Sequence, residues 1–257
     1  MILYPSPIFG PVHSRRLGIS LGINLMPADG KLCSFDCVYC ECGFNGENRP
    51  NQPRPTREAV ADALEDKLCE MVNEGELPDV LTFAGNGEPT LHIDFADIVE
   101  DTLMLRDKYC PNAKVSVLSN ATALHRERVF EALKKVDNNI QKLDTVDLDY
   151  IHAIDRPSGS YDVETLVENL ARFDGHVIIQ TMFMTGWTEQ NFNADNTGDK
   201  FVEPWLDALE RIKPSQVMIY TIERRCPDEG LRKAKPEVLD AIAEKVRARG
   251  FECSVSY

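Results

Sequence analysis

Three cysteines near the start of the chain have a spacing that could hold a metal cluster. Cys33, Cys37 and Cys40 follow a CxxxCxxC pattern within one short segment of the 257-residue chain. Three thiolates on such a segment can ligate an iron–sulfur cube and leave its fourth iron without a protein ligand. That open iron can take an exogenous ligand, which indicates chemistry rather than electron storage alone. Zinc is the main alternative metal, although it usually takes four ligands.

A second polar motif follows an apolar run later in the chain. It reads Gly-Asn-Gly-Glu-Pro and contains Asn86, Gly87 and Glu88. The two motifs resemble those of the radical S-adenosylmethionine (radical SAM) superfamily, in which an aromatic residue, here Tyr39, precedes the third cysteine. Asn86 stands where the superfamily motif has its first glycine. The resemblance implies that this second motif binds the amino group of the SAM methionine through backbone carbonyls and an acidic side chain.

Three further segments resemble one branch of the superfamily, the wyosine-forming tRNA enzymes. They are residues 11–24, 179–182 and 219–224, so the resemblance covers about residues 10–225. The chain departs from that branch in two ways. No cysteine precedes Cys33, so the amino-terminal cysteines that bind a second cluster in those enzymes are missing. Their pyruvate-holding lysine has no secure counterpart, because Lys31 is also interpretable as a surface residue.

Length and composition favour a single cytoplasmic domain. The chain is 43% hydrophobic, and α/β barrels often run to ~200–250 residues as one domain. We expect one domain over residues 1–257, with a core at about 10–225 and a C-terminal helix and short strand in 236–257. No apolar run reaches the ~18 residues that cross a bilayer, and the first residues lack the features of a signal peptide. Clustered cysteines in a cytosolic chain indicate metal ligands sooner than disulfides.

The net charge counts against nucleic acid as a partner. It is -14, from 28 Lys+Arg against 42 Asp+Glu, whereas nucleic-acid-binding domains usually have a basic face. A local basic surface could still form. Its members would be Arg15, Arg16, Lys31, Arg224, Arg225, Arg232, Lys233 and Lys235. The ordinary alternative is scattered solvated charge.

Apolar strands alternate with amphipathic helices along the chain. The predicted strands are 20–25, 80–83, 114–119, 140–143, 176–183 and 216–221, with a short closing strand at 251–255. The predicted helices are a segment capped by Thr56 and the segments 98–108, 126–135, 163–173, 202–212 and 236–249. Six strand–helix repeats imply parallel pairing with right-handed crossovers. We therefore expect an α/β fold, a partial, open (β/α)6 TIM-like barrel, which the resemblance also implies.

The working residues of such barrels lie at the carboxyl ends of the strands. The cysteines follow the first predicted strand, Gly87 and Glu88 the second, Asn120 the third and Asp144 the fourth. We interpret Asn120 and Asp144 as candidate SAM contacts. Their ordinary alternatives are a turn asparagine and a helix-capping aspartate. Gln180 and Thr181 are further candidates, because polar residues in a buried strand need partners; alternation decides which of the two faces the lumen, and Gln180 is the preferred one.

Two segments without a helix or strand pattern, 152–157 and 186–198, are expected to be long loops over the same face. Such loops are often lids or substrate loops, and a disordered surface insertion is the alternative. Arg156, Tyr220 and Arg224 could meet an anionic substrate there. A salt bridge to an acidic residue is the ordinary alternative for either arginine.

The resemblance implies a mechanism in which a reduced [4Fe-4S] cluster transfers an electron to the sulfonium of SAM. A 5'-deoxyadenosyl radical then abstracts hydrogen from the substrate. Such an oxygen-sensitive enzyme requires a low-potential electron donor such as flavodoxin or ferredoxin. Three hypotheses follow: a wyosine-like RNA modification enzyme, an activase of a glycyl-radical enzyme that acts on a protein partner, and a non-catalytic metal module in which Cys42 supplies a fourth ligand to zinc.

Overall fold

The computed structural model describes residues 1–14 and 18–257, and its central feature is a curved, mostly parallel sheet. Within the described residues the sheet has eight strands in the order β1-β2-β3-β4-β5-β6-β8-β10. β1 is antiparallel to β2, and every other neighbouring pair is parallel. The strands are β1 (Ile8–Ser14), β2 (Gly18–Ile23), β3 (Val80–Phe83), β4 (Lys114–Ser119), β5 (Asn138–Lys142), β6 (Ile178–Met182), β8 (Gln216–Tyr220) and β10 (Cys253–Ser256).

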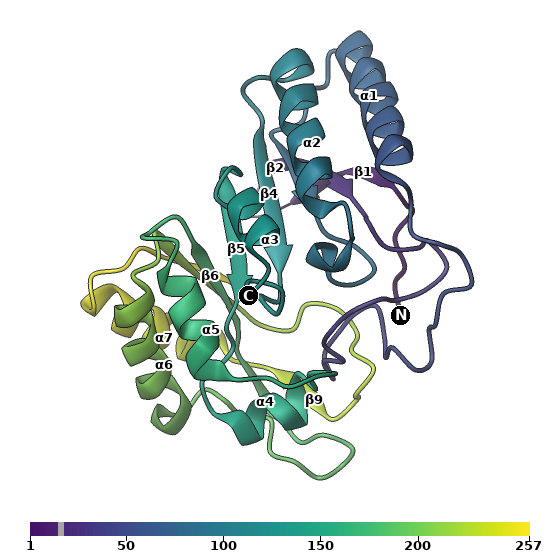
Figure 1. The fold of residues 1–257 in the computed structure, drawn as a ribbon. Helices are drawn as coiled ribbons and strands as arrows, with labels where there is room; N and C mark the ends of the chain where they lie inside the picture. Colours follow the sequence, from purple (N-terminus) through teal and green to yellow (C-terminus); the bar gives the residue numbers. More distant parts are fainter. Residues whose placement is uncertain (15–17) are drawn as a thin grey trace.

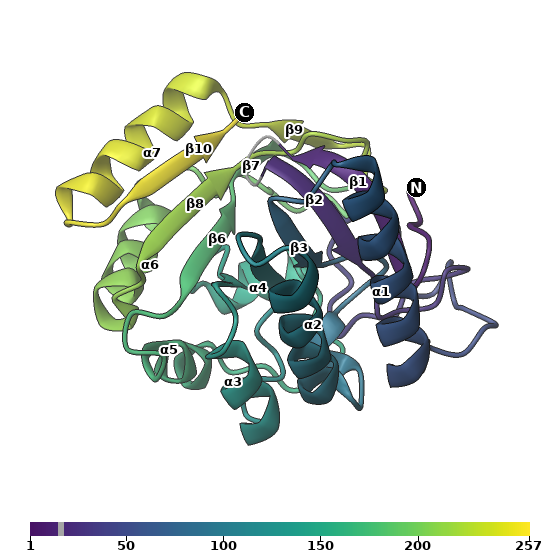
Figure 2. The ribbon, with the colours of Figure 1, turned by 90° about the horizontal axis from the view of Figure 1, so that it is seen from above.

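Helices cover the outer face of the sheet, as Figure 1 and Figure 2 show. They are α1 (Arg57–Glu74), α2 (Phe95–Tyr109), α3 (Glu127–Leu133), α5 (Val163–Ala171), α6 (Asp199–Ile212) and α7 (Pro236–Ala248). Thr56 begins α1 as predicted, because its side chain accepts a hydrogen bond from the Ala59 N–H. Leu64 and Leu68 of α1 are buried in the main core, which packs between the helices and the sheet. None of the helices in the described residues is long and apolar enough to cross a membrane.

The predicted fold class is confirmed as a partial, open TIM-like barrel. The strands predicted at 80–83 and 114–119 coincide with β3 and β4, and the others differ by a few residues at their ends. β10 pairs with β8 in parallel, where the sequence indicated a short closing strand. Buried, mostly apolar runs such as Val80–Phe83 are typical of strands covered on both faces, which explains why the pattern located them.

The structure contains elements that the sequence pattern did not indicate. Residues 152–157 are not a loop over their whole length, because α4 (Leu148–Ile154) includes His152. Asp147 begins α4 by accepting a hydrogen bond from the Tyr150 N–H. A single 3-10 turn, η1 (Pro89–Leu91), follows the Gly-Asn-Gly-Glu motif. β7 (Met184–Gly186) and β9 (Leu231–Lys233) form a separate antiparallel pair, and residues 187–198 form the expected irregular loop.

The inner face of the sheet becomes polar toward the carboxyl ends of its strands. Ile140, Ile178 and Met218 form a small apolar cluster that is separate from the main core under the helices. Side chains alternate between the two faces of a strand, so Lys142 and Gln180 share the inner face with this cluster. The register of β5 and β6 places these two residues opposite each other.

Candidate functional site

Backbone hydrogen bonds fix the cysteine loop, which follows β2, to two other parts of the barrel. The Leu32 N–H donates to the Asn86 carbonyl at 3.0 Å, and the Glu88 N–H donates to the Leu32 carbonyl at 3.0 Å. Further along the loop, the Val38 N–H donates to the Ile154 carbonyl at 2.9 Å. The loop is therefore held between the turn after β3 and the end of α4.

Gly87 allows the turn after β3 to approach the cysteine loop closely. Its φ is +138°, and a Cβ placed on it would lie 1.8 Å from the carbonyl oxygen of Leu32. A glycine meets both conditions, since it has no Cβ and adopts positive φ without strain. Leu32 immediately precedes Cys33, so this contact sets the position of the first cysteine.

Cys33, Cys37 and Cys40 are free, half-buried thiols with different surroundings. The Cys33 sulfur accepts hydrogen bonds from the Phe35 N–H and from Asn120 Nδ2, each at 3.5 Å. Burial raises the pKa of Cys33 to about 12 and the pKa of Cys37 well above its usual value. Both thiols therefore lose their protons less readily than an exposed cysteine does.

The thiols of Cys40 and Cys42 affect each other. The hydrogen bond with Cys42, followed by the positive charge of Lys31, lowers the pKa of Cys40 to about 6. The same hydrogen bond, together with burial, raises the pKa of Cys42, whose thiol also lies 3.5 Å from the Gly85 carbonyl. Cys40 thus becomes a thiolate, the form that ligates metals, more readily than Cys42.

Lys31 is buried, so its interpretation as a surface residue is wrong. The residue is 2% exposed, and its Nζ donates to the Gly43 carbonyl at 2.7 Å. The carboxylate of Asp36 lies 3.4 Å from the same nitrogen. The ammonium group therefore lies inside the cysteine loop.

Glu88 holds the turns after β3 and β4 together. Its carboxylate is buried and accepts hydrogen bonds from the Asn120 N–H at 2.6 Å and from the Thr90 hydroxyl at 2.6 Å. Burial raises the pKa of Glu88. The Asn120 side chain donates in turn to Ser34 Oγ at 2.9 Å, beside Cys33. These contacts bring together predicted site residues from three separate strand ends.

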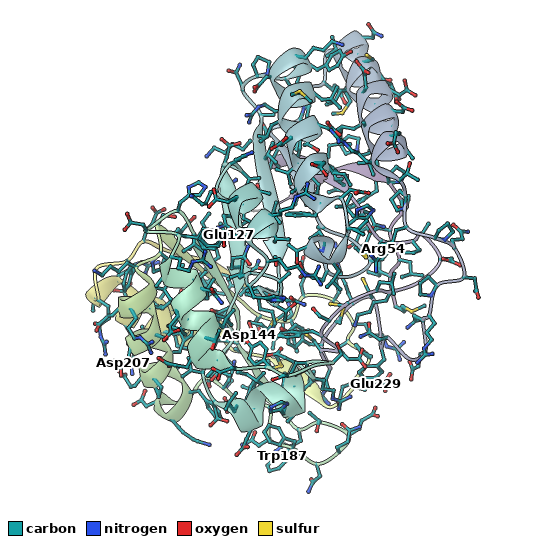
Figure 3. The ribbon with its side chains drawn as sticks, in the orientation of Figure 1. Arg54, Glu127, Asp144, Trp187, Asp207 and Glu229 are labelled. Atoms are coloured by element: carbon teal, nitrogen blue, oxygen red, sulfur yellow. The ribbon has the colours of Figure 1, made fainter. Side chains whose placement is uncertain are left out.

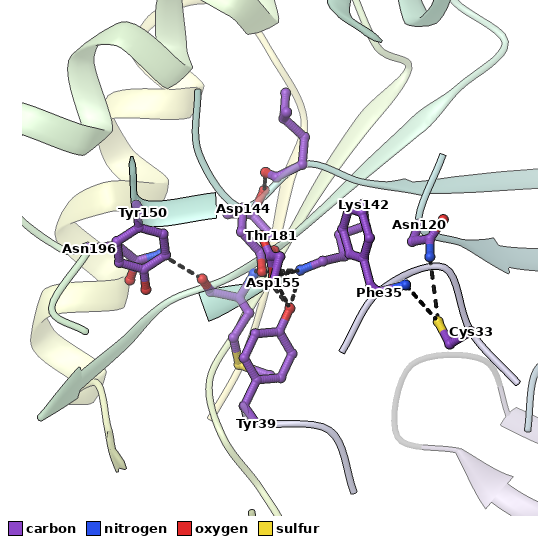
Figure 4. A network of polar contacts seen from close by, with 12 residues as sticks. Cys33, Phe35, Tyr39, Asn120, Lys142, Asp144, Tyr150, Asp155, Thr181 and Asn196 are labelled. Atoms are coloured by element: carbon purple, nitrogen blue, oxygen red, sulfur yellow. Dashed lines mark hydrogen bonds and ion pairs between the residues drawn. The ribbon is translucent and has the colours of Figure 1, made fainter. Parts of the chain in front are cut away.

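A charged network beside the cysteine loop centres on Lys142, as Figure 4 shows. The Lys142 ammonium lies 2.7 Å from Asp155 Oδ1 and also contacts Asp144 and the Tyr39 hydroxyl. Tyr39 donates to Asp144 Oδ2 at 2.5 Å, and the other oxygen of Asp144 accepts the Met182 N–H at 2.9 Å. Burial raises the pKa of Asp155 to about 6. The network thus joins β5, β6, the end of α4 and the cysteine loop.

Sequence reasoning identified Tyr39 and Asp144 but missed Lys142 and Asp155. The helix-capping interpretation of Asp144 is wrong, because Asp147 caps α4 instead. The available signal for Lys142 was its place as a lysine at the carboxyl end of a predicted strand, two residues before Asp144.

Gln180 faces the inside of the barrel, opposite Lys142. Thr181 lies on the other face of β6 and donates to a backbone carbonyl at 2.7 Å. Tyr220 lies on the inner face too, in register with Met182. The inner surface above the small apolar cluster therefore combines an amide, an ammonium group and a phenol.

The two arginines considered for an anionic substrate contact other side chains. Arg224 pairs with Glu41 at 2.5 Å, which is the salt bridge named as its alternative. Arg156 donates to Gln190 Oε1 at 2.7 Å, in the loop after β7. Arg15 and Arg16, predicted for a local basic surface, lie outside the described residues.

The loop of residues 187–198 lies at the rim of the molecule. Figure 3 shows Trp187 and Glu229 at one end, with Asp144 nearer the centre. Trp187 is 55% exposed, and its N–H donates to the Gly230 carbonyl at 3.3 Å. This rim is therefore built from two segments, one after β7 and one after β8.

Comparison with known families decides how this site is to be understood. Residues 29–197, well over half of the chain, match the radical SAM superfamily. The chain belongs to the radical SAM superfamily. As a radical SAM enzyme it uses SAM and requires a reductant, so the interpretation as a non-catalytic metal module is set aside.

Two relatives of known sequence match most of this chain. A UPF0026 protein from Methanocaldococcus jannaschii is 31% identical over 91% of this chain and 69% of its own length, so the chain is also a member of the UPF0026 family. A protein from Brachyspira hyodysenteriae named GTPase Obg is 27% identical over 96% of this chain, which spans 34% of that protein's length.

Two solved structures show the same fold at low sequence identity. A radical SAM methyltransferase from Sphaerobacter thermophilus has a TM-score of 0.69 at 14% identity, over 93% of this chain and 66% of the other. Archaeal TYW1 has a TM-score of 0.53 at 12% identity, over 90% of this chain and 72% of the other. At such identities the likeness extends to the fold alone.

The cysteine loop of this radical SAM enzyme has the donor chemistry that an iron–sulfur cluster needs. It presents three free thiols, and thiolates are the usual ligands of such clusters. Hydrogen bonds from Phe35 and Asn120 reach the Cys33 sulfur, and Lys31 supplies positive charge near Cys40. Donors and cations around the sulfurs offset the negative charge that thiolate ligation brings into a half-buried site. The residues present therefore fit the cofactor.

Proposed function

We propose that this enzyme binds a [4Fe-4S] cluster through Cys33, Cys37 and Cys40 and cleaves SAM reductively. The observation that supports it is the placement of these thiols at the carboxyl ends of parallel strands, next to the Glu88–Asn120 pair and the Lys142 network. When bound, the cluster would supply the electron that cleaves SAM to a 5'-deoxyadenosyl radical, which abstracts hydrogen from the substrate.

The residues around the cysteines would bind and orient SAM. We assign this role to Tyr39, Asn86, Gly87, Glu88, Asn120, Asp144 and Gln180. Their positions support the assignment: Glu88 fixes the turns on either side of Cys33, and Asp144 is held by Tyr39, Lys142 and the backbone of β6. A site whose side chains are fixed before binding loses less entropy when the ligand arrives.

For the substrate, we propose a wyosine-like modification of RNA, with Arg156, Tyr220 and Arg224 as candidate contacts. The resemblance of residues 179–182 and 219–224 supports this branch, and Tyr220 on the inner face gives an aromatic surface that a base can stack on. The net charge of -14 and the Arg224–Glu41 pair oppose it. Retention of tRNA on a filter at low salt, at micromolar enzyme, would support an RNA substrate, and a protein substrate predicts none.

The proposal also covers the electron donor and the cellular compartment of the enzyme. We infer a low-potential donor, a flavodoxin or a ferredoxin, because reducing such a cluster in the presence of SAM requires one. The eight cysteines are all free, which is typical of a reducing compartment, and we place the enzyme in the cytoplasm as one domain spanning residues 1–257.

The test is production of 5'-deoxyadenosine by the anaerobically reconstituted and reduced chain after SAM is added. Wild type is expected to form it and Cys37→Ala to form none, because one of the three ligands is lost. Cys69→Ala is the matched control, since Cys69 lies on α1, outside the cysteine loop, and should keep full activity. A wild-type chain that holds a reducible cluster but forms no 5'-deoxyadenosine would contradict the proposal.

A further inference from the structure

Lys31 is a buried cation enclosed by the loop that carries the three cysteines. Its side chain is 1% exposed, and its Nζ donates to the Gly43 carbonyl at 2.7 Å. Its backbone N–H donates to the Asn48 carbonyl at 2.7 Å, so both ends of the residue are bonded to the returning part of the loop. An ammonium group is strongly hydrated in water, so burying it is costly unless nearby groups compensate.

The carboxylate beside Lys31 compensates its charge only in part. The carboxylate of Asp36 lies 3.4 Å away, but its side chain is 29% exposed and its Oδ1 also accepts the Asn45 N–H at 2.7 Å. Water screens an exposed charge more than a buried one, so Asp36 offsets Lys31 only in part. By contrast, Lys142 is matched by the two carboxylates of Asp144 and Asp155.

The backbone of the cysteine loop links Lys31 to Cys40. An ammonium group has three N–H donors, and the Gly43 and Asp36 contacts use two of them. The same Gly43 donates its own N–H to the Cys40 carbonyl at 2.9 Å, so one residue joins the ammonium group to the backbone of that cysteine. Lys31 therefore carries a buried positive charge inside the loop that holds all three candidate ligands.

We propose that Lys31 is a positioning residue that holds the cysteine loop through Gly43 and raises the reduction potential of the cluster bound by this loop. This inference rests on the proposed function, since it requires that cluster. In the reduction, one electron passes from the donor to the cluster, no bond forms or breaks, and Lys31 keeps its proton.

The direction of the change in reduction potential follows from the net charge of the cluster. A [4Fe-4S] core of charge 2+ with three thiolates has a net charge of about -1, and reduction makes it about -2. A buried positive charge stabilises the more negative state more, so it favours reduction. Hydrogen bonds to cluster sulfurs act in the same direction.

The test is a redox titration of the anaerobically reconstituted full-length chain, with dithionite as reductant, followed by electron paramagnetic resonance. Lys31→Met removes the charge and keeps an unbranched side chain. We expect the ratio of reduced to oxidised cluster at a fixed potential to fall about tenfold. For one electron, this corresponds to a midpoint potential lower by about 59 mV. Asp36→Asn removes the opposing charge and should raise that ratio. Lys114→Met, at an exposed position that begins β4, is the matched control and should leave it unchanged.

The outcomes separate this inference from the proposed function. A wild-type midpoint in both Lys31→Met and Asp36→Asn, at full iron content, would overturn the redox role of Lys31 while the cluster assignment stood. If Lys31→Met takes up no cluster, Asp36→Asn decides alone: a raised midpoint supports the proposal, and an unchanged one overturns it. A wild-type chain that takes up no reducible cluster would overturn the proposed function first, and this inference with it.

Discussion

At the scale of single residues, the site is dominated by charges with little access to water. The side chains of Lys142, Asp144 and Asp155 are 14%, 0% and 3% exposed, and they lie in one network with Tyr39. Pairs of this kind often contribute little net stability, because desolvation offsets their attraction. Removing one partner is different, since the remaining charges stay buried without compensation. The network should therefore be sensitive to single substitutions and tolerant of paired ones.

Replacing Lys142 by methionine should lower the free energy of unfolding by about 3–5 kcal/mol, because it leaves two buried carboxylates without their cation. The double variant Lys142→Met with Asp155→Asn should recover part of that loss, since one stranded charge is gone. Urea unfolding of the cluster-free chain measures both. Lys135→Met is the control: its pair with Glu100 is half-exposed, so it should cost no more than about 1 kcal/mol. Equal losses in the two lysine variants would contradict the burial argument.

At the scale of elements, the position of the cysteine loop depends on the turn after β3. Gly87 packs its Cα against the Leu32 carbonyl, where any Cβ would overlap the backbone. The loop therefore cannot keep its place if this glycine is replaced, even though no thiol is lost.

Gly87→Ala should reduce the iron bound per chain after reconstitution at least about tenfold, because displacing Leu32 also moves Cys33. The measurement is iron and sulfide content together with the cluster absorbance. Gly46→Ala is the matched control within the same loop, since nothing lies within 4 Å of a Cβ built there. Normal loading of Gly87→Ala would show that the cysteine loop folds independently of this turn.

The buried side chain of Asn196 anchors the end of the loop after β7. Asn196 Oδ1 accepts the Met184 N–H at 3.0 Å, and its Nδ2 donates to the Met182 carbonyl at 2.9 Å. Asn196→Ala should cost about 2–3 kcal/mol, because it leaves buried backbone groups unpaired. It should also speed limited proteolysis within residues 187–198. Asn193→Ala, at an exposed position, should change neither, and equal cleavage rates in the two variants would contradict the anchoring role.

The sequence predicted the elements whose pattern is local and missed those set by distant contacts. Val80–Phe83 and Lys114–Ser119 are buried runs between clear turns, so the pattern located both strands. Ile8–Ser14 escaped because it contains a proline and an irregular register, and its partner strand alone makes it a strand. α4 is a short helix that begins at the Asp147 cap, and its last residues fall in the segment 152–157 that was expected to be a loop.

In the candidate site too, residues marked by the local sequence were predicted and residues set by distant contacts were missed. The cysteines, Glu88 and Asn120 were found because each belongs to a motif or directly follows a predicted strand. Lys142 was missed because a lysine in a short strand ordinarily indicates a solvated position. Its partners are Asp155, 13 residues away, and Tyr39, 103 residues away, so nothing local marks it as buried.

At the scale of the whole molecule, the charge bears on every macromolecular partner. The net charge is -14, and the predicted basic surface is partly neutralised. Arg224 pairs with Glu41, and Arg225 pairs with Glu229. Long-range fields depend on the sum of charges, whereas docking depends on local patches. Ionic strength separates the two effects, because it screens distant charges first.

Reduction of the cluster by an acidic flavodoxin should therefore speed up as salt increases. Between about 0.01 M and about 0.15 M ionic strength the Debye length falls from about 30 Å to about 8 Å, which screens the repulsion between two acidic proteins. We expect the second-order rate constant, measured anaerobically by stopped flow, to rise by up to about tenfold. Methyl viologen radical cation is the control, since the same field attracts it and salt should slow its reaction. If salt instead slowed the flavodoxin reaction, the donor would have to approach over a local positive surface. Arg232→Glu should then slow the reaction at low salt. The Arg232 guanidinium donates to backbone carbonyls, so its charge remains available to a partner.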